Sequence, residues 1–181
     1  TSMNLDEKII SALKDLDYKE ATEIQKKAIP IALKKRDILA AAQSGTGKTA
    51  AFLLPILTEL LANKQVDKPI LRALILVPTR ELATQISKAV SDFSKYMEVE
   101  SLAMVGGVST KDQEKKIAKG LDILVATSGR LMEHLKNGTV DLSSVTTVVI
   151  DEVDTMLDMG FLEDIEKILP SVGPKRQIMM F

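Results

Sequence analysis

The chain of 181 residues contains no cysteine, so neither a disulfide framework nor a thiolate metal site is possible. It also lacks an apolar run of the roughly 18–20 residues that a membrane-spanning helix needs, and it shows no signal-peptide pattern. Internal repeats and low-complexity segments are missing too. We therefore expect an ordinary globular protein, not bound to a membrane, in the cytoplasm.

An excess of charge is also lacking, because the formal net charge is only −1. Overall charge therefore gives no sign of nucleic-acid binding. The local distribution is more informative, since seven acidic residues and no basic one lie between Asp151 and Glu166. We expect nucleic acid to avoid that face, whereas a divalent cation would be attracted to it.

What the chain does contain is a regular alternation of short apolar runs with longer helical patterns. The predicted strands are 37–42, 71–77, 99–105, 121–127, 146–151 and 176–181, and helical patterns fill the intervals between them. The strands are almost continuously apolar, as strands buried on both faces are. This order predicts an α/β fold, with a mostly parallel sheet covered by helices on both faces.

Within this fold we expect one structural domain, with two helical stretches in residues 1–36 and the α/β part in residues 37–181. The last strand, 176–181, is expected at an edge of the sheet. The single histidine, His134, is interpreted as a surface residue of a helix without a ligand partner. Ligands of such sheets bind beyond the carboxyl ends of the strands, and Asp151 and Glu152 follow one of those ends.

A phosphate-binding loop is predicted at "AAQSGTGKTAAF" (41–52), which follows the first strand and opens a long helix. Glycines allow the main-chain N–H groups to turn inward around a phosphate, and the helix N-terminus adds positive potential. A lysine in this position reaches the β- and γ-phosphates, and the following hydroxyl binds Mg²⁺. The nucleotide-binding residues predicted here are Ser44, Gly45, Thr46, Gly47, Lys48 and Thr49. A phosphate loop needs a carboxylate on a neighbouring strand, and Asp151 is suitably placed.

Several short motifs in order resemble the first RecA-like domain of DEAD-box RNA helicases. They are "YKEATEIQ" (18–25), "AQSGTGKT" (42–49), "PTRELA" (78–83), "GG" (106–107), "TSGR" (127–130), "DEVD" (151–154) and "LDMGF" (157–161). The resemblance covers essentially the whole chain. It implies a RecA-like fold of the P-loop NTPase type, with ATP and Mg²⁺ as cofactors and RNA as a partner.

The same resemblance implies roles in adenine recognition. Tyr18 would stack on the base, in a position where the family usually has phenylalanine. The amide of Gln25 would accept from adenine N6–H and donate to N7. Guanine offers acceptors at both positions, so this amide would select ATP over GTP. Without the motif, Tyr18 would be a packing residue and Gln25 an unremarkable polar residue of a helix.

For the chemistry, the resemblance makes Glu152 the general base for the attacking water. Asp151 would hold Mg²⁺, partly through water and together with Thr49, and Lys48 would contact the phosphates. Asp154 would couple hydrolysis to domain movement. Val153 replaces the usual alanine, and overpacking by its methyl groups would cost about 1–3 kcal/mol unless its neighbours are smaller; we expect a tolerated variant.

The remaining motifs resemble contacts to the RNA backbone, which give affinity but little sequence information. The residues implied are Thr79, Arg80, Gly106, Gly107, Thr127 and Arg130. Taken singly, these motifs are also compatible with ordinary structure: Arg80 and Glu81 could form a surface ion pair, and the two glycines could be a simple turn.

The chain stops at Phe181, where the family continues with Ser-Ala-Thr. The resemblance therefore implies that a second RecA-like domain and its arginine fingers lie outside this chain. An arginine finger increases the hydrolysis rate by a factor of about 10³–10⁵, so we expect this fragment to bind nucleotide with little or no hydrolysis. We also expect it to be a monomer. The leading hypothesis is the ATP-binding domain of an RNA helicase that unwinds duplexes locally. Two alternatives stay open: another P-loop NTPase, or a catalytically silent RNA-binding adaptor.

Overall fold

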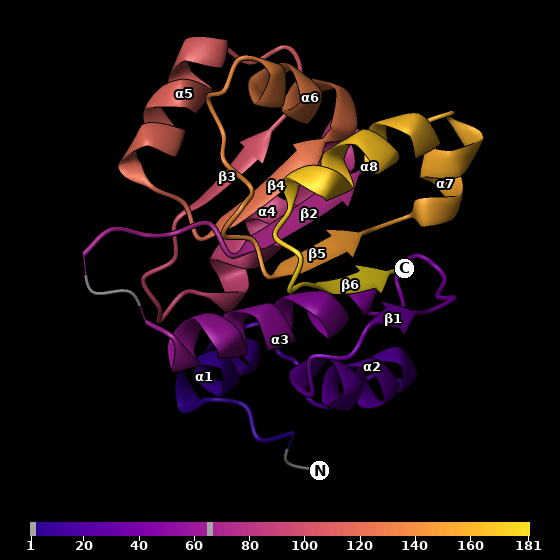
Figure 1. The fold of residues 1–181 in the computed structure, drawn as a ribbon. Helices are drawn as coiled ribbons and strands as arrows, with labels where there is room; N and C mark the ends of the chain where they lie inside the picture. Colours follow the sequence, from indigo (N-terminus) through magenta and orange to yellow (C-terminus); the bar gives the residue numbers. More distant parts are fainter. Residues whose placement is uncertain (1–2, 65–66) are drawn as a thin grey trace.

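A six-stranded sheet forms the centre of the computed structural model, which describes residues 3–64 and 67–181. The strands are β1 (Ile38–Leu39), β2 (Ala73–Val77), β3 (Ser101–Met104), β4 (Ile123–Thr127), β5 (Thr147–Ile150) and β6 (Gln177–Met180). Their order is β1-β6-β5-β2-β4-β3, and every neighbouring pair is parallel. All the strand arrows therefore point the same way, and their carboxyl ends meet at one edge of the sheet (Figure 1).

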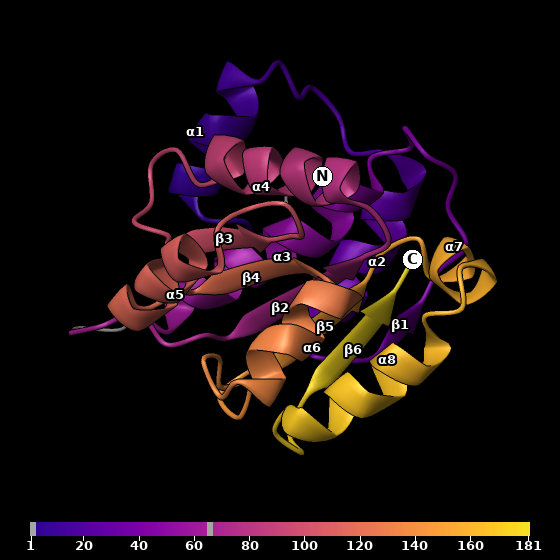
Figure 2. The same ribbon diagram turned by 90° about the horizontal axis from the view of Figure 1, so that it is seen from above.

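Helices cover both faces of the sheet (Figures 1 and 2). One face carries α1 (Glu7–Asp15), α2 (Glu23–Leu33), α3 (Lys48–Ala62) and α4 (Arg80–Phe93). The other carries α5 (Thr110–Lys119), α6 (Ser128–Lys136), α7 (Val153–Asp158) and α8 (Leu162–Ile168), which continues into a 3-10 turn (Leu169–Ser171). No helix of the described ranges combines the length and hydropathy needed to cross a bilayer.

Alternation along the strands explains the two layers. In β2, Ala73, Ile75 and Val77 belong to the core beneath α1–α4. Leu74 and Leu76, between them, belong to the core beneath α5–α8. Successive side chains of a strand point to opposite faces, so a strand that is covered on both faces must be apolar throughout. The predicted α/β class, with a parallel sheet between helices, is confirmed.

The observed helices and strands differ from the predictions in three ways. Every strand is shorter than expected, and β1 has only the two residues Ile38 and Leu39. The short helix α7 was not predicted, because six residues are too few for a helical period to stand out. The expectation that the last strand lies at an edge is wrong, since β6 pairs with β1 on one side and β5 on the other.

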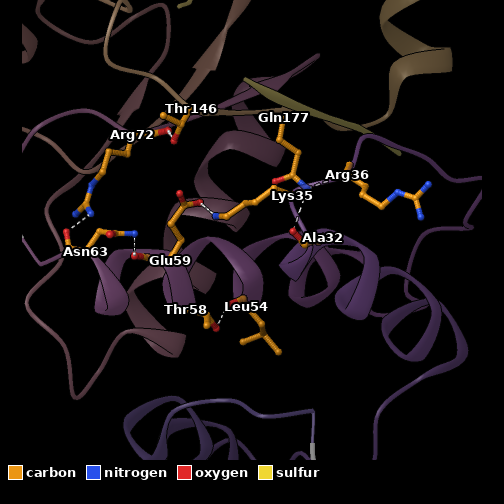
Figure 3. A network of polar contacts seen from close by, with 10 residues as sticks. All are labelled: Ala32, Lys35, Arg36, Leu54, Thr58, Glu59, Asn63, Arg72, Thr146 and Gln177. Atoms are coloured by element: carbon orange, nitrogen blue, oxygen red, sulfur yellow. Dashed lines mark hydrogen bonds and ion pairs between the residues drawn. The ribbon is translucent and has the colours of Figure 1, made fainter. Parts of the chain in front are cut away.

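The side chain of Gln177 connects β6 to the end of α2 by hydrogen bonds, as Figure 3 shows. The amide nitrogen of Gln177 donates to the carbonyl oxygens of Ala32 (3.1 Å) and Arg36 (2.7 Å). Ala32 lies in the last turn of α2 and Arg36 lies just beyond the end of the helix. The contact joins residues about 140 positions apart in the chain and holds β6 beside β1.

Candidate functional site

The loop between β1 and α3 has the backbone of a phosphate cradle. Gly45 and Gly47 have φ values of +79° and +84°, a left-handed conformation that glycine adopts without steric cost. Gly47 is the N-cap of α3, so the unpaired N–H groups at the start of that helix face the loop. The Thr46 hydroxyl donates to the carbonyl of Gln43 at 2.6 Å, while Ser44 is exposed.

Lys48, the first residue of α3, lies between two carboxylates. Its ammonium is 3.1 Å from Oδ1 of Asp151 and 3.8 Å from Oε1 of Glu152. Asp151 is completely buried at the end of β5, and its Oδ1 also accepts from the main-chain N–H of Glu152 at 3.0 Å. The structure thus places the predicted catalytic lysine, metal ligand and general base in one cluster.

The second oxygen of Asp151, Oδ2, is buried and has no hydrogen-bond partner among the described residues. Burial raises the pKa of this carboxyl, and the nearby Lys48 ammonium acts in the opposite direction. A buried carboxylate with an unpaired oxygen is unfavourable unless further positive charge or a donor reaches it. The cluster holds one ammonium against two carboxylates, so its chemistry suits an additional cation.

The donor set matches Mg²⁺ that arrives with a nucleotide. In the described ranges no group of three or more His, Cys, Asp or Glu side chains could hold a metal by itself. Magnesium in nucleotide sites is commonly bound by one or two carboxylates, with phosphates and water completing the shell. Asp151 and the half-buried Thr49 could supply the protein part of such a shell.

The acidic motif leaves the sheet through a strained residue. Glu152 has φ +53° and ψ +52°, a left-handed conformation that is uncommon for a residue with a side chain. Val153 then begins α7, its N–H donates to the carbonyl of Phe181 at 2.9 Å, and its side chain packs against the core beneath α5–α8. Asp154 is exposed, and its Oδ1 accepts from the N–H of Thr155.

The two residues predicted to recognise adenine, Tyr18 and Gln25, both line one cavity of about 330 Å³. Gln25 is 3% exposed, and its amide joins two segments: Oε1 accepts from the N–H of Thr22, and Nε2 donates to the carbonyl of Gly47, both at 3.0 Å. Tyr18 is exposed and meets Phe93 edge-on, with ring centroids 5.7 Å apart. Gln25 therefore connects the segment predicted to recognise adenine to the phosphate loop.

The motifs predicted to bind RNA converge beyond the ends of β2, β3 and β4. Gly107 lies so close to Arg80 that a Cβ there would be 2.8 Å from the guanidinium. Arg130 donates from Nη1 to the hydroxyl of Thr110 at 2.8 Å and to the carbonyl of Val108 at 3.4 Å. The structure therefore brings two arginines to the loop that contains the paired glycines.

The other residues of this face lie at the strand ends as expected. The Thr79 hydroxyl caps α4 by accepting from the N–H of Leu82 at 3.2 Å. Thr127 is the last residue of β4, and Gly106 has open space where a Cβ would stand. Small and hydroxyl-bearing residues here leave the main chain accessible to a ligand.

The surface interpretation of His134 is wrong. The side chain is completely buried, with Nε2 2.9 Å from Oε1 of Gln113 and Nδ1 2.7 Å from the hydroxyl of Thr139. Burial and the positive charge of Arg130 lower the pKa of the imidazole. Helical spacing could have revealed this, because His134 lies three residues after the buried Leu131. Gln113 was also missed, since a lone polar residue in a charged helix gives no signal.

Comparisons with known proteins agree with this fold. The family model described as DEAD/DEAH box helicase matches residues 22–181. A probable ATP-dependent RNA helicase, ddx27, of Dictyostelium discoideum is 43% identical over 99% of this chain and 23% of its own length. The ATP-dependent RNA helicase DeaD of Escherichia coli (strain K12) is 45% identical over 96% of this chain and 27% of its own length.

A solved structure has the same fold. It is described as a hypothetical ATP-dependent RNA helicase from Sulfolobus tokodaii, is 38% identical and superimposes with a TM-score of 0.86. The match covers 97% of this chain and 50% of that one. The chain thus spans about a quarter of the length of the curated relatives that it matches. Because the family model extends over most of its residues, the chain belongs to the DEAD/DEAH box helicase family.

Proposed function

We propose that this chain is the ATP-binding and RNA-binding domain of an ATP-dependent RNA helicase that separates short duplexes. The observation that carries the proposal is the position of two sites on one edge of the sheet. Lys48, Asp151 and Glu152 form the first, and the contacts of Arg80 and Arg130 with the paired-glycine loop form the second. Neighbouring strands β2 and β5 connect them, so a change in one can reach the other.

In this proposal the phosphate loop binds the nucleotide. The N–H groups of the loop and the start of α3 receive the phosphates, and Lys48 turns from the carboxylates toward them. Thr49 and Asp151 would hold Mg²⁺, which would neutralise developing charge on the phosphates. The unpaired Oδ2 of Asp151 supports this assignment.

In this proposal the base is recognised by the hydrogen-bond donor and acceptor that remain free on the Gln25 amide. An amide oxygen can accept two hydrogen bonds and an amide nitrogen can donate two. Thr22 N–H can only donate and the Gly47 carbonyl can only accept, so their bonds fix which end of the amide is which. One acceptor site and one N–H are left over. That pair matches N6–H and N7 of adenine and mismatches the two acceptors of guanine.

We assign Glu152 as the general base that accepts a proton from the attacking water. Its left-handed backbone directs α7 away from the sheet and leaves the carboxylate beside Lys48. The exposed Asp154 would bond the family's Ser-Ala-Thr segment and so link hydrolysis to movement of a second RecA-like domain, which would supply the remaining transition-state contacts. Single-stranded RNA would lie across the face formed by Thr79, Arg80, Gly106, Gly107, Thr127 and Arg130, with the protein acting as a monomer.

The first experiment measures Mg²⁺-dependent binding of ADP, ATP, GDP and GTP to this chain and to Gln25→Ala. We expect wild type to prefer adenine nucleotides and the variant to lose the preference together with some affinity. Equal binding of guanine nucleotides by wild type would contradict the assignment and favour a general P-loop NTPase. In the longer protein, RNA-stimulated ATP hydrolysis that disappears in Glu152→Gln distinguishes the helicase from a silent adaptor.

A further inference from the structure

A buried chain of polar side chains runs beneath the loop that carries the paired glycines. The loop follows β3, and Val105 immediately precedes Gly106. The carbonyl of Val105 accepts from Nε2 of Gln113 at 3.1 Å, and Gln113 is 1% exposed. Oε1 of the same amide contacts Nε2 of His134, which is completely buried. Two helices, α5 and α6, therefore meet at one fixed point of the loop.

The positions of the protons in this hydrogen-bonded network can be assigned starting from the carbonyl of Val105. A carbonyl oxygen only accepts, so the amide nitrogen of Gln113 must face Val105 and the amide oxygen must face His134. His134 therefore carries its proton on Nε2 and donates it to Gln113. The other ring nitrogen, Nδ1, then accepts from the hydroxyl of Thr139 in the neutral imidazole, because this contact is 2.7 Å whereas the alternative acceptor of the same hydroxyl, the main-chain carbonyl of His134, is 3.1 Å away. Each nitrogen and oxygen atom of the Gln113, His134 and Thr139 side chains within this network therefore has a hydrogen-bond partner.

The loop needs such an anchor because its own sequence provides little rigidity. Gly106 meets no neighbour where a Cβ would stand, and Gly107 has φ +78°. Glycine loses more conformational freedom on ordering than any other residue, so two in succession make a fixed loop costly. The contacts from Arg80 and Arg130 are made by side chains that a phosphate ligand would also attract. The Val105–Gln113 bond is the anchor that lies in the core.

We infer that Gln113 and His134 are positioning residues that hold the Gly106–Gly107 loop in the geometry needed to contact the RNA backbone. His134 acts through Gln113, by fixing the orientation of its amide. The inference rests on the proposed RNA-binding face. It extends that function to two residues that would not touch RNA themselves.

The test compares affinity for RNA with affinity for nucleotide. We would measure binding of an oligouridylate RNA of about ten nucleotides, and separately of Mg²⁺–ADP, for wild type, Gln113→Leu, His134→Leu and His134→Gln. Gln113→Leu and His134→Leu should bind RNA about tenfold more weakly, as is common when an outer hydrogen-bond partner of a site is lost. ADP affinity should stay unchanged, and His134→Gln should restore RNA affinity because its amide can still donate to Gln113.

Ser144→Ala is the matched control. The Ser144 hydroxyl also donates to a main-chain carbonyl, that of Leu71 at 2.7 Å. Leu71 precedes β2, so this contact lies at the amino ends of the strands, away from the proposed RNA-binding face. This variant should lose stability without losing RNA affinity. Unchanged RNA binding in both leucine variants would overturn the inference. So would an equal loss of RNA and ADP binding, which indicates general destabilisation.

Hydrogen exchange separates the inference from the proposed function. Amides 106–108 should exchange faster in Gln113→Leu and His134→Leu than in wild type, and at the wild-type rate in Ser144→Ala. If wild type binds no RNA while these amides respond as expected, the RNA-binding face is wrong but the positioning of the loop stands. If the amides do not respond, the positioning role itself is refuted.

Discussion

The amide nitrogen of Gln25 donates to the carbonyl oxygen of Gly47 at 3.0 Å and joins segments 22 residues apart. The approach is so close that a Cβ on Gly47 would stand 2.4 Å from that nitrogen. The phosphate loop and the segment proposed to recognise adenine therefore form one unit. A substitution in either segment should therefore alter the geometry of the other.

Gly47→Ala should destabilise the protein more than Gly45→Ala. Both glycines have a left-handed backbone, which costs about 1–2 kcal/mol for any other residue. Only at Gly47 would the new methyl group collide with Gln25, whereas Gly45 has no neighbour within 4 Å. We expect an additional loss of about 1–3 kcal/mol from this overpacking, measured by urea unfolding. Equal losses in the two variants would show that Gln25 moves aside freely.

Lys48→Met should strongly destabilise the protein, because it leaves Asp151 buried without its cation. Breaking a buried ion pair by removing one partner typically costs about 3–5 kcal/mol. Asp151→Asn in the same background removes the unpaired charge and should recover most of the loss. A double-mutant cycle of unfolding free energies measures the coupling. Strictly additive effects would mean that the 3.1 Å contact contributes no stability.

Removal of Mg²⁺ should weaken nucleotide binding only while its ligands are intact. We expect chelation to lower the ADP affinity of wild type by about tenfold, equivalent to about 1.4 kcal/mol. Asp151→Asn and Thr49→Val should bind ADP more weakly from the start and respond little to chelation. Calorimetric titration with and without EDTA measures this. A full response to EDTA in both variants would place the metal elsewhere.

The stability of the protein should depend on pH through its single histidine. Burial lowers the pKa of His134 below the ordinary value of 6.5, so the unfolded chain binds more protons than the folded one below that pH. The contribution of His134 is therefore complete above pH 6.5 and is lost as pH falls toward the folded-state pKa. His134→Gln should show a flatter unfolding free energy between about pH 5 and pH 7. Parallel curves for the two proteins would contradict the shift.

Replacement of Ser128 by proline should destabilise the protein less than replacement by alanine. Its hydroxyl donates to Asp164 at 3.0 Å, and both variants lose this bond, worth about 1.5–3 kcal/mol when the acceptor is charged. Ser128 is the first residue of α6, where proline is favoured. The preceding Thr127 has φ −82° and ψ 145°, a conformation compatible with a following proline. Thermal unfolding of Ser128→Ala and Ser128→Pro provides the comparison.

Local patterns in the sequence determined much of the fold. Continuous apolar runs such as 71–77 and 121–127 locate strands that are buried on both faces, because period and composition are local properties. The phosphate loop is equally local: it is a few residues between a strand and a helix. The order of the motifs along the chain was sufficient for the resemblance to a family.

Only the tertiary structure decided which of these segments touch. It put β6 inside the sheet, placed Lys48 between two acids about 100 residues later in the chain, and set Arg80 against Gly107. It also buried His134, which the sequence alone had suggested was exposed. The physical reason is that strand order and side-chain pairing depend on contacts between distant residues. Neither periodicity nor composition records such contacts.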